Sequence, residues 1–554
     1  MKRKKICFPA LLFLFGITSL FAQDRSFATL PLAQKPNAIR SAEMYGKETP
    51  QYQKVLSVYN RLVQARGDFR YPVPALALLK EVKQMAAMDY SKLEIILEER
   101  AYQVCSSFGN QSDAALALLL AHELTHYYEK HGWRKGFVED NIDLDIGLRL
   151  DSLTDNAAKE TEADYLGGFL VYSAGYGLFD KGPEVLAKLY QAYEMPVEKS
   201  DKYPSLSDRQ SMGRRSAEKL AQLVEVFDMA NLLTAIGNYT DAYAFYYQVL
   251  MVYQSREIYN NLGVTALLDA MQYFSPADLK YRFPIELDLT STATRDVSLA
   301  PNRDSLLRQA LLHFDAAISM DPQYAPAYLN KACAYALLKD YNRARFYAGV
   351  EAHQAALKNN YPKTALGADV LNGILDALEG EEGRAQTTFK AAASAGSPLA
   401  AQNLRILLGE RIETEIGAQG APDKPERIDE KVLARVAEEG KVDDSKTIAL
   451  AKQLYFYQNP LQGPHSRLFV SENSYTKKTT YLHLTSAGYA GKTARQIGLG
   501  DDRTAIVAVY GEPGHTIETP RGEIMVYKKN KKMIFLLNPS GKLERWGNYL
   551  VQEQ

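Results

Sequence analysis

The sequence predicts an α+β multidomain protein, with a mainly helical first domain, an α-solenoid in the middle and a small α+β domain at the end. The chain has 554 residues, whereas single domains usually hold about 100–200 residues. Small and aromatic residues recur through the middle of the chain, and strand-like runs cluster before and after it. We expect a segment 1–22, a first domain 23–225, a solenoid 226–410, a linker 411–430 and a C-terminal domain 431–554.

The first 22 residues have the pattern of a secretory signal peptide. Lys2–Lys5 are basic, an apolar run starts at Ile6, and cleavage is expected after Ala22. A membrane anchor is the alternative, but the apolar run is only about 17 residues long and contains Pro9. No later stretch is apolar for 18 residues, so we expect a periplasmic or secreted chain without a transmembrane span. Peripheral membrane association through a partner stays open.

The charge balance and the cysteines exclude further classes. With 65 Lys and Arg against 66 Asp and Glu, the formal charge is −1, so no nucleic-acid partner is expected. Cys105 and Cys333, the cysteines outside the expected signal peptide, fall in different expected domains. A disulfide framework is therefore not expected.

A period of 34 residues runs through the middle of the chain, from about 228 to 410. Its clearest copy extends from Ala310 through Phe314 to Pro322, and Tyr328 opens the next copy in register. Small residues let paired helices approach closely and aromatic residues fill the space between them. This is the pattern of tetratricopeptide repeats, which predicts three to four repeats, an irregular insertion near 272–304 and docking of a protein partner. The pattern also includes Ala317, Ala332, Tyr335, Ala344, Ala242, Tyr246, Gly373, Ala385, Phe389 and Ala392.

Hydrophobic periodicity predicts the elements on either side of the solenoid. A strand or two is expected over Lys92–Cys105, followed by a long helix from Asp113. After the linker a helical stretch is expected near 430–456. Strands are then expected over Thr479–Thr485, Glu523–Lys528 and Met533–Leu537, with the basic run 528–532 as a solvated hairpin tip.

The stretch AHELTHYYEKHGW, residues 121–133, carries the pattern HExxH. His122 and His126 are four residues apart, so on a helix they share one face and can bind one ion. Glu123 lies about 100° around the helix from His122, which keeps it off the ion but close to a water held there. Two imidazoles with such a carboxylate favour Zn²⁺, which lowers the pKa of the water toward about 7 while Glu123 takes the proton as general base.

The third ligand must come from elsewhere. His131 falls one residue short of the third histidine in the pattern HExxHxxGxxH, and Glu129 stands where that pattern has glycine. Lys159–Asp164 offers an alternative, because Glu160 and Asp164 lie four residues apart on one helical face. Glu160 is expected to ligate the ion while Asp164 accepts the free N–H of a ligand histidine. The following Gly167 and Gly168 allow close helix packing.

HExxH followed by ExEAD and by Ala174-Gly175-Tyr176 resembles the HtpX and CAAX-prenyl-protease family of gluzincin metallopeptidases. Among these the chain looks most like the soluble envelope members of the BepA type, which carry tetratricopeptide repeats. The resemblance covers about residues 85–215 and implies a zincin-like, mainly helical protease domain with one Zn²⁺ per chain. It implies the same roles for His122, His126, Glu160, Glu123 and Asp164.

Family members also carry a His-Pro-x-x-x-x-Arg signature, where this chain has Tyr203 through Arg209. Arg209 is a candidate to order the site or to meet developing oxyanion charge. Tyr203 replaces the family histidine, which puts in doubt any latch in which that histidine occupies the metal. Tyr203 is a candidate hydrogen-bond donor to the tetrahedral intermediate, with packing as the alternative role.

The leading hypothesis is a zinc endopeptidase that cleaves unfolded or misassembled envelope proteins, with the repeats docking substrates or an assembly partner. The alternative is a repeat scaffold or chaperone with a vestigial or structural metal site. Glu123 favours the enzyme, because a structural site has no use for a base and is usually closed by a fourth protein ligand.

Overall fold

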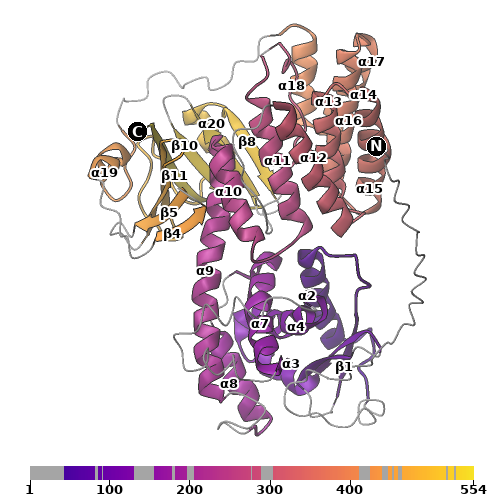
Figure 1. Cartoon of the computed structure of the whole chain (residues 1–554), viewed down its shortest axis with the longest axis vertical. Coiled ribbons are helices and arrows are strands. Elements are labelled where there is room, and N and C mark those ends of the chain that lie inside the picture. Colours follow the sequence, from indigo (N-terminus) through magenta and orange to yellow (C-terminus); the bar gives the residue numbers. More distant parts are fainter. Residues whose placement is uncertain are drawn as a thin grey trace, which may run out of the picture.

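The computed structural model places most of the chain, and Figure 1 shows its ribbon. The described residues are 43–80, 85–89, 92–129, 155–177, 181–195, 205–275, 277–287, 303–410, 425–439, 447–451, 454–459, 465–519, 522–528 and 532–553. The expected signal peptide, 1–22, lies outside these ranges, as does most of the expected linker. Within them, no helix combines the length and the apolar character that crossing a membrane requires.

Helices surround a small sheet in the first part of the chain. The strand order is β1-β3-β2, with β1 parallel and β2 antiparallel to β3. Helix α4 packs against β2 and β3 and shares a buried apolar core with α2. The elements are α2 (Pro50–Arg66), β1 (Ala75–Leu79), β2 (Ala86–Asp89), β3 (Glu94–Glu98), α3 (Glu99–Ser106), η1 (Gly109–Gln111), α4 (Ser112–Tyr128), α7 (Asp155–Val171), η2 (Tyr172–Tyr176) and α8 (Gly182–Ala192).

The expectation of strands over Lys92–Cys105 is right only for its first half. Strand β3 ends at Glu98, and α3 follows without a connecting loop. Ala101 and Cys105 are both buried, and their spacing of four residues is that of a helical face. The second half of the run therefore buries its apolar residues with the helical period.

Paired helices form the middle of the chain. Helices α11, α13, α16 and α18 contact one another in succession, and we call them the inner helices. Pro326, Pro362 and Pro398 lie in the first turns of three inner helices, so this part repeats every 36 residues rather than every 34. The helices are α9 (Leu206–Ile236), α10 (Tyr239–Leu250), α11 (Arg256–Met271), α12 (Arg303–Met320), α13 (Ala325–Leu337), α14 (Tyr341–Arg345), η3 (Phe346–Ala352), α15 (His353–Lys358), α16 (Pro362–Leu378), α17 (Glu382–Ser394) and α18 (Pro398–Leu407).

Glycine and phenylalanine complement each other within these pairs. A Cβ added to Gly263 would lie 2.4 Å from the ring of Phe314, and one added to Gly373 would lie 2.7 Å from the ring of Phe389. Both rings are completely buried. Gly373 and Phe389, a small and an aromatic position of the predicted pattern, are therefore in direct contact, and Gly263 and Phe314 form an equivalent pair.

Helix α9 joins the first part of the chain to the solenoid. It has 31 residues, and the boundary expected at 225–226 falls inside it. One continuous apolar core extends from Phe169 on α7 through the solenoid to Tyr549 in the C-terminal sheet. In Figure 1, α9 runs from beside α7 and α8 up to the sheet.

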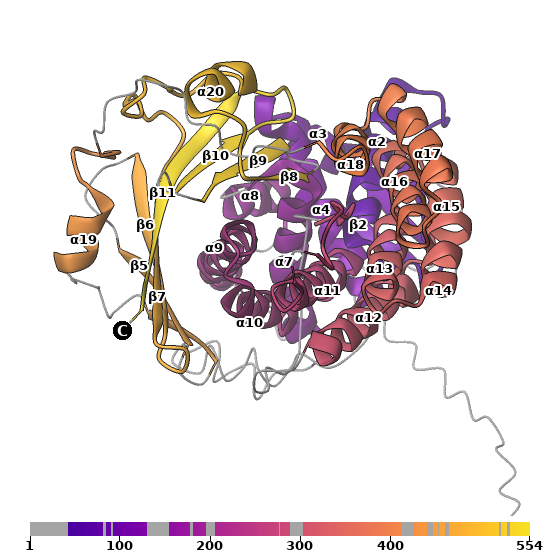
Figure 2. The ribbon, with the colours of Figure 1, turned by 90° about the horizontal axis from the view of Figure 1, so that it is seen from above.

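The C-terminal part is an eight-stranded antiparallel sheet, of order β4-β5-β6-β7-β11-β10-β9-β8. Figure 2 shows it curving past α9 and α10, where Phe245 meets Phe456 with ring centroids 5.3 Å apart. The helix expected near 430–456 is present over Leu433–Glu439, but the prediction is wrong from Thr447 on, where β4 and β5 form. The elements are α19 (Leu433–Glu439), β4 (Thr447–Ala451), β5 (Leu454–Asn459), β6 (Ser466–Asn473), β7 (Lys478–Thr485), α20 (Arg503–Tyr510), β8 (His515–Thr519), β9 (Gly522–Tyr527), β10 (Met533–Leu537) and β11 (Leu543–Glu553).

Candidate metal centre

Helix α4 places the HExxH residues in the interior of the first domain. It is apolar on nearly all sides, and α2, α3, α7, β2 and β3 pack around it. Because its surroundings are packed, the directions of His122, Glu123 and His126 are fixed. The side chains of His122 and Glu123 are buried.

Helix α7 crosses α4 at a glycine. A Cβ added to Gly167 would lie 3.1 Å from the backbone N of His122 and 3.2 Å from the carbonyl carbon of Ala121. This close approach brings the preceding turns of α7, with Glu160 and Asp164, beside the histidines. The close packing that the sequence predicts for Gly167 is therefore present beside the candidate ligands His122 and Glu160.

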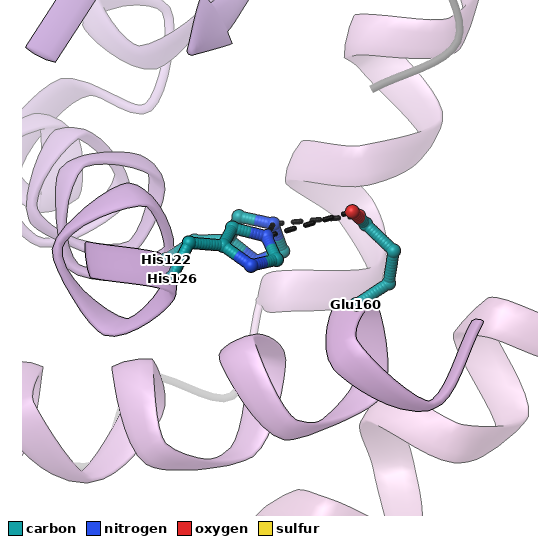
Figure 3. Close-up of side chains that lie close together, drawn as sticks. All are labelled: His122, His126 and Glu160. Atoms are coloured by element: carbon teal, nitrogen blue, oxygen red, sulfur yellow. Dashed lines mark hydrogen bonds and ion pairs between the residues drawn. The ribbon is translucent and has the colours of Figure 1, made fainter. Parts of the chain in front are cut away.

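Three side chains from α4 and α7 converge on one point, as Figure 3 shows. Nε2 of His122 lies 3.1 Å from Nε2 of His126. Glu160 lies 3.5 Å from each of these nitrogens, through its Oε2 and Oε1 respectively. All three ligand atoms lie within 4.8 Å of one another.

Asp164 contacts His122 through the ring nitrogen Nδ1, which faces away from the common point. Its Oδ1 lies 2.8 Å from Nδ1 of His122, and this contact orients the ring so that Nε2 faces the common point. The helical spacing of four residues puts Asp164 one turn beyond Glu160. The structure therefore brings His122, His126, Glu160 and Asp164 together as the sequence predicts.

The ionisation of the cluster follows from burial and from these contacts. Burial alone would lower the pKa of His122, but its hydrogen bonds with Asp164 and Glu160 raise it to about 10. Burial alone would raise the pKa of Glu160, yet its contacts with His122 and His126 hold that pKa well below its usual range. Without an ion, His122 is therefore protonated beside the Glu160 anion, and a divalent cation bound at this point would replace the proton on Nε2.

The donor set fits zinc in both chemistry and spacing. Zinc bonds to nitrogen and oxygen of about 2.0–2.1 Å in a tetrahedron separate the ligand atoms by about 3.3–3.4 Å. Here the two histidine nitrogens are 3.1 Å apart, and each lies 3.5 Å from a different oxygen of the Glu160 carboxylate. Two histidines and one glutamate also leave the fourth position of a catalytic zinc site open.

Glu123 points toward the edge strand β2. Burial raises the pKa of its carboxyl group, and the nearby His122 and the backbone N–H of Met88 lower it. Met88 belongs to β2, which pairs with β3 along one edge. The Glu123 carboxyl group therefore lies buried between the histidines and the edge strand of the sheet.

The remaining predicted residues lie at or beyond the limits of the described chain. Arg209 is in the first turn of α9, and the structure gives no position for its side chain. Tyr203 and His131 lie outside the described residues. The roles suggested for them stay predictions.

An arginine that the sequence does not single out lies at the C-terminal end of α4. Arg66 is buried, and it donates hydrogen bonds to Glu129 Oε1 at 2.9 Å and to the carbonyl oxygen of Gln254 at 2.6 Å. Its guanidinium also stacks over the rings of Tyr128 and Tyr253. Arg66 thus connects the C-terminal end of α4 to the solenoid, through contacts between residues 63 and 188 positions apart.

Comparison with known proteins bears on the repeats. No protein-family model matches the chain. Tetratricopeptide repeat protein 36 of Danio rerio is 36% identical over 143 residues, which make up 26% of this chain and 69% of that protein. A match of 143 residues corresponds to about four repeats of the 36-residue length found in this structure. Through its repeats, the chain belongs to the family of tetratricopeptide repeat proteins.

Proposed function

We propose that the chain is a zinc-dependent endopeptidase that hydrolyses peptide bonds in unfolded or misassembled proteins of the cell envelope. The observation that carries this proposal is the convergence of His122, His126 and Glu160 on one point, with the buried base Glu123 beside it. The resemblance of the two metal motifs to gluzincin peptidases supports it. The signal-like segment 1–22 supports a periplasmic or secreted location.

Each residue has a distinct part in hydrolysis. Zn²⁺ held by the two histidines and Glu160 would activate a water and polarise the scissile carbonyl. Glu123 removes a proton from the attacking water and later returns it to the leaving amine. Asp164 keeps His122 in the tautomer that offers Nε2 to the metal.

Strand β2 is suited to hold the substrate. One edge pairs with β3, and the N–H of Met88 near Glu123 marks the other edge as facing the base. An extended peptide can add to such an edge through backbone hydrogen bonds, which do not depend on its sequence. Unfolded segments present such backbone along their whole length, whereas in folded proteins most of it is already paired.

The test replaces Glu123 by Gln in the full mature chain. Loss of the base is expected to lower cleavage of a casein-like substrate about 10²–10⁴-fold, while one zinc per chain stays bound. Glu184→Gln is the matched control, because Glu184 is an exposed residue of α8 far from the cluster in sequence. Loss of zinc in Glu123→Gln would contradict the assigned role. A folded wild-type chain that binds no added zinc and leaves casein uncut in its presence would refute the proposal.

The match to a tetratricopeptide repeat protein favours a second candidate, a repeat scaffold or chaperone with a structural or vestigial metal site. The same pair of proteins separates the two. If the chain is a scaffold, the wild type and Glu123→Gln should suppress aggregation of an unfolded client protein to the same extent, and neither form should cleave that client.

A further inference from the structure

An extended segment of the chain lies across the inner helices of the solenoid. Residues 280–287, with the sequence KYRFPIEL, belong to the insertion that interrupts the repeat pattern and contain no helix or strand. The hydrogen bonds of this segment lead to α18, α16, α13 and α11. It therefore runs along the inner helices in the reverse order of the repeats.

At its N-terminal end the segment is held by Asn403 of α18. The backbone N–H of Arg282 donates to Asn403 Oδ1 at 2.8 Å, and Asn403 Nδ2 donates to the carbonyl oxygen of Arg282 at 2.9 Å. One completely buried carboxamide thus binds both backbone groups of a single residue. The side chain of Arg282 is exposed and takes no part in these two bonds.

Near its C-terminal end the segment is held in the same way by Asn330 of α13. The N–H of Glu286 donates to Asn330 Oδ1 at 2.8 Å, and Asn330 Nδ2 donates to the carbonyl oxygen of Glu286 at 2.7 Å. Asn260 of α11 donates to the same carbonyl at 3.1 Å and accepts from Asn330 at 2.8 Å. The Thr364 hydroxyl donates to the Glu286 carboxylate at 2.7 Å.

The side chains of the segment are buried at every third position. Tyr281, Pro284 and Leu287 are buried, and the residues between them are partly or fully exposed. Tyr281 packs near Phe389. A Cβ added to Gly367 of α16 would lie 3.3 Å from Cβ of Pro284, so this glycine lets the segment approach α16.

These contacts have the properties of a peptide-binding groove. Two buried asparagines recognise the N–H and C=O of extended backbone, which every polypeptide offers, and three apolar contacts select the side chains. Buried carboxamides also need hydrogen-bond partners, so the groove requires an occupant of this kind. The occupant in this structure is the chain's own segment.

We propose that residues 281–287 are an internal occupant of the inner face of the solenoid, and that a partner segment of extended polypeptide binds by displacing them. The partner carries an aromatic residue, a proline or aliphatic residue and an aliphatic residue at positions i, i+3 and i+6, with a carboxylate at i+5. The apparent association constant for the partner is the intrinsic constant multiplied by the fraction of time that the internal segment leaves the groove free. This proposal does not depend on the metal site.

A reversible lock tests the exchange. The background is the full chain with Cys333→Ala, because the Cys333 thiol lies 3.8 Å from the Pro284 carbonyl oxygen and could compete for the disulfide. Pro284→Cys and Gly367→Cys are then added. Their Cβ atoms would lie near the spacing of a disulfide, which is about 3.5–4.5 Å. The probe is a fluorescent peptide with the sequence of residues 279–287, LKYRFPIEL. The reduced chain is expected to bind it at least tenfold more tightly than the oxidised chain.

Two controls complete the test. With Gly367→Cys alone, binding should not change on oxidation, and Asn330→Ala added to the reduced pair should weaken binding at least tenfold. Equal binding by the oxidised and reduced chains, or no binding by a reduced chain that melts like wild type, would overturn the proposal.

If the cysteine pair prevents folding, hydrogen exchange of the unaltered chain decides. An isotope-labelled copy of the peptide, added in excess, should accelerate exchange of the Arg282 and Glu286 amides by displacing the segment. Unchanged exchange of these amides would show that the segment is a permanent part of the solenoid.

Discussion

Asp164 offers the sharpest test of the metal centre, because it contacts a proposed ligand without binding the ion. Replacing Asp164 by Ala removes the acceptor 2.8 Å from Nδ1 of His122. Losing such a partner typically costs about 10–100-fold in metal affinity. The Asp164 side chain is 32% exposed, so water screens the contact and replaces part of it. We therefore expect the lower half of this range, about 10–30-fold, which corresponds to about 1.4–2 kcal/mol.

Competition with a chromophoric zinc chelator at neutral pH measures this affinity. Asp164→Asn keeps an oxygen acceptor but loses the charge, so its affinity should lie between those of wild type and Asp164→Ala. Asp113→Ala is a suitable control, because it removes an exposed ion pair at the start of the same metal-binding helix. An Asp164→Ala affinity within twofold of wild type would refute the reasoning, since His122 would then need no partner at Nδ1.

Three further predictions concern the solenoid and the sheet, and thermal or urea unfolding tests each. Arg256→Met should destabilise the chain by about 3–5 kcal/mol, because it leaves the buried carboxylates of Glu257 and Asp321 without their cation. Arg343→Met, at an exposed position, should change the stability little. Gly263→Ala should cost about 1–3 kcal/mol by overpacking against a buried ring, whereas Gly383→Ala, which meets nothing, should be slightly stabilising. Burial lowers the pKa of His483 to about 4, so as the pH falls the unfolded state takes up a proton at this histidine before the folded state does. Wild type should therefore lose stability between pH 6.5 and 4 relative to His483→Gln, by up to about 3 kcal/mol.

The metal cluster could be predicted because each half of it is a local pattern. His122 and His126 lie one turn apart on a helix, as do Glu160 and Asp164, so helical geometry alone places each pair on one face. The glycine at 167 then indicates where the second helix can approach the first. Helical geometry does not say that these two helices pack together. The need for a third metal ligand suggested that they do.

The junction between the first part and the solenoid could not be predicted in this way. Arg66 and Arg256 lie in unremarkable helical sequence, and the backbone oxygens that they bind are those of Gln254 and Gln64. A carbonyl oxygen is present at every residue, so no sequence pattern marks it as a partner. Position in the fold alone decides which carbonyl a buried arginine meets.

The same physics explains why the segment 281–287 looked like an irregular insertion. Asn330 and Asn403 each bind a backbone N–H and the C=O of the same residue, and such contacts leave no requirement on the side chain of the bound residue. Only the three-residue spacing of buried positions is visible in the sequence, and it matches neither the helical period of 3.6 nor the strand period of 2. A segment without either period is read as a loop. The regular spacing of buried residues in segment 281–287 comes from the groove that holds the segment. Because the groove binds mainly backbone groups, another polypeptide could take the place of the segment.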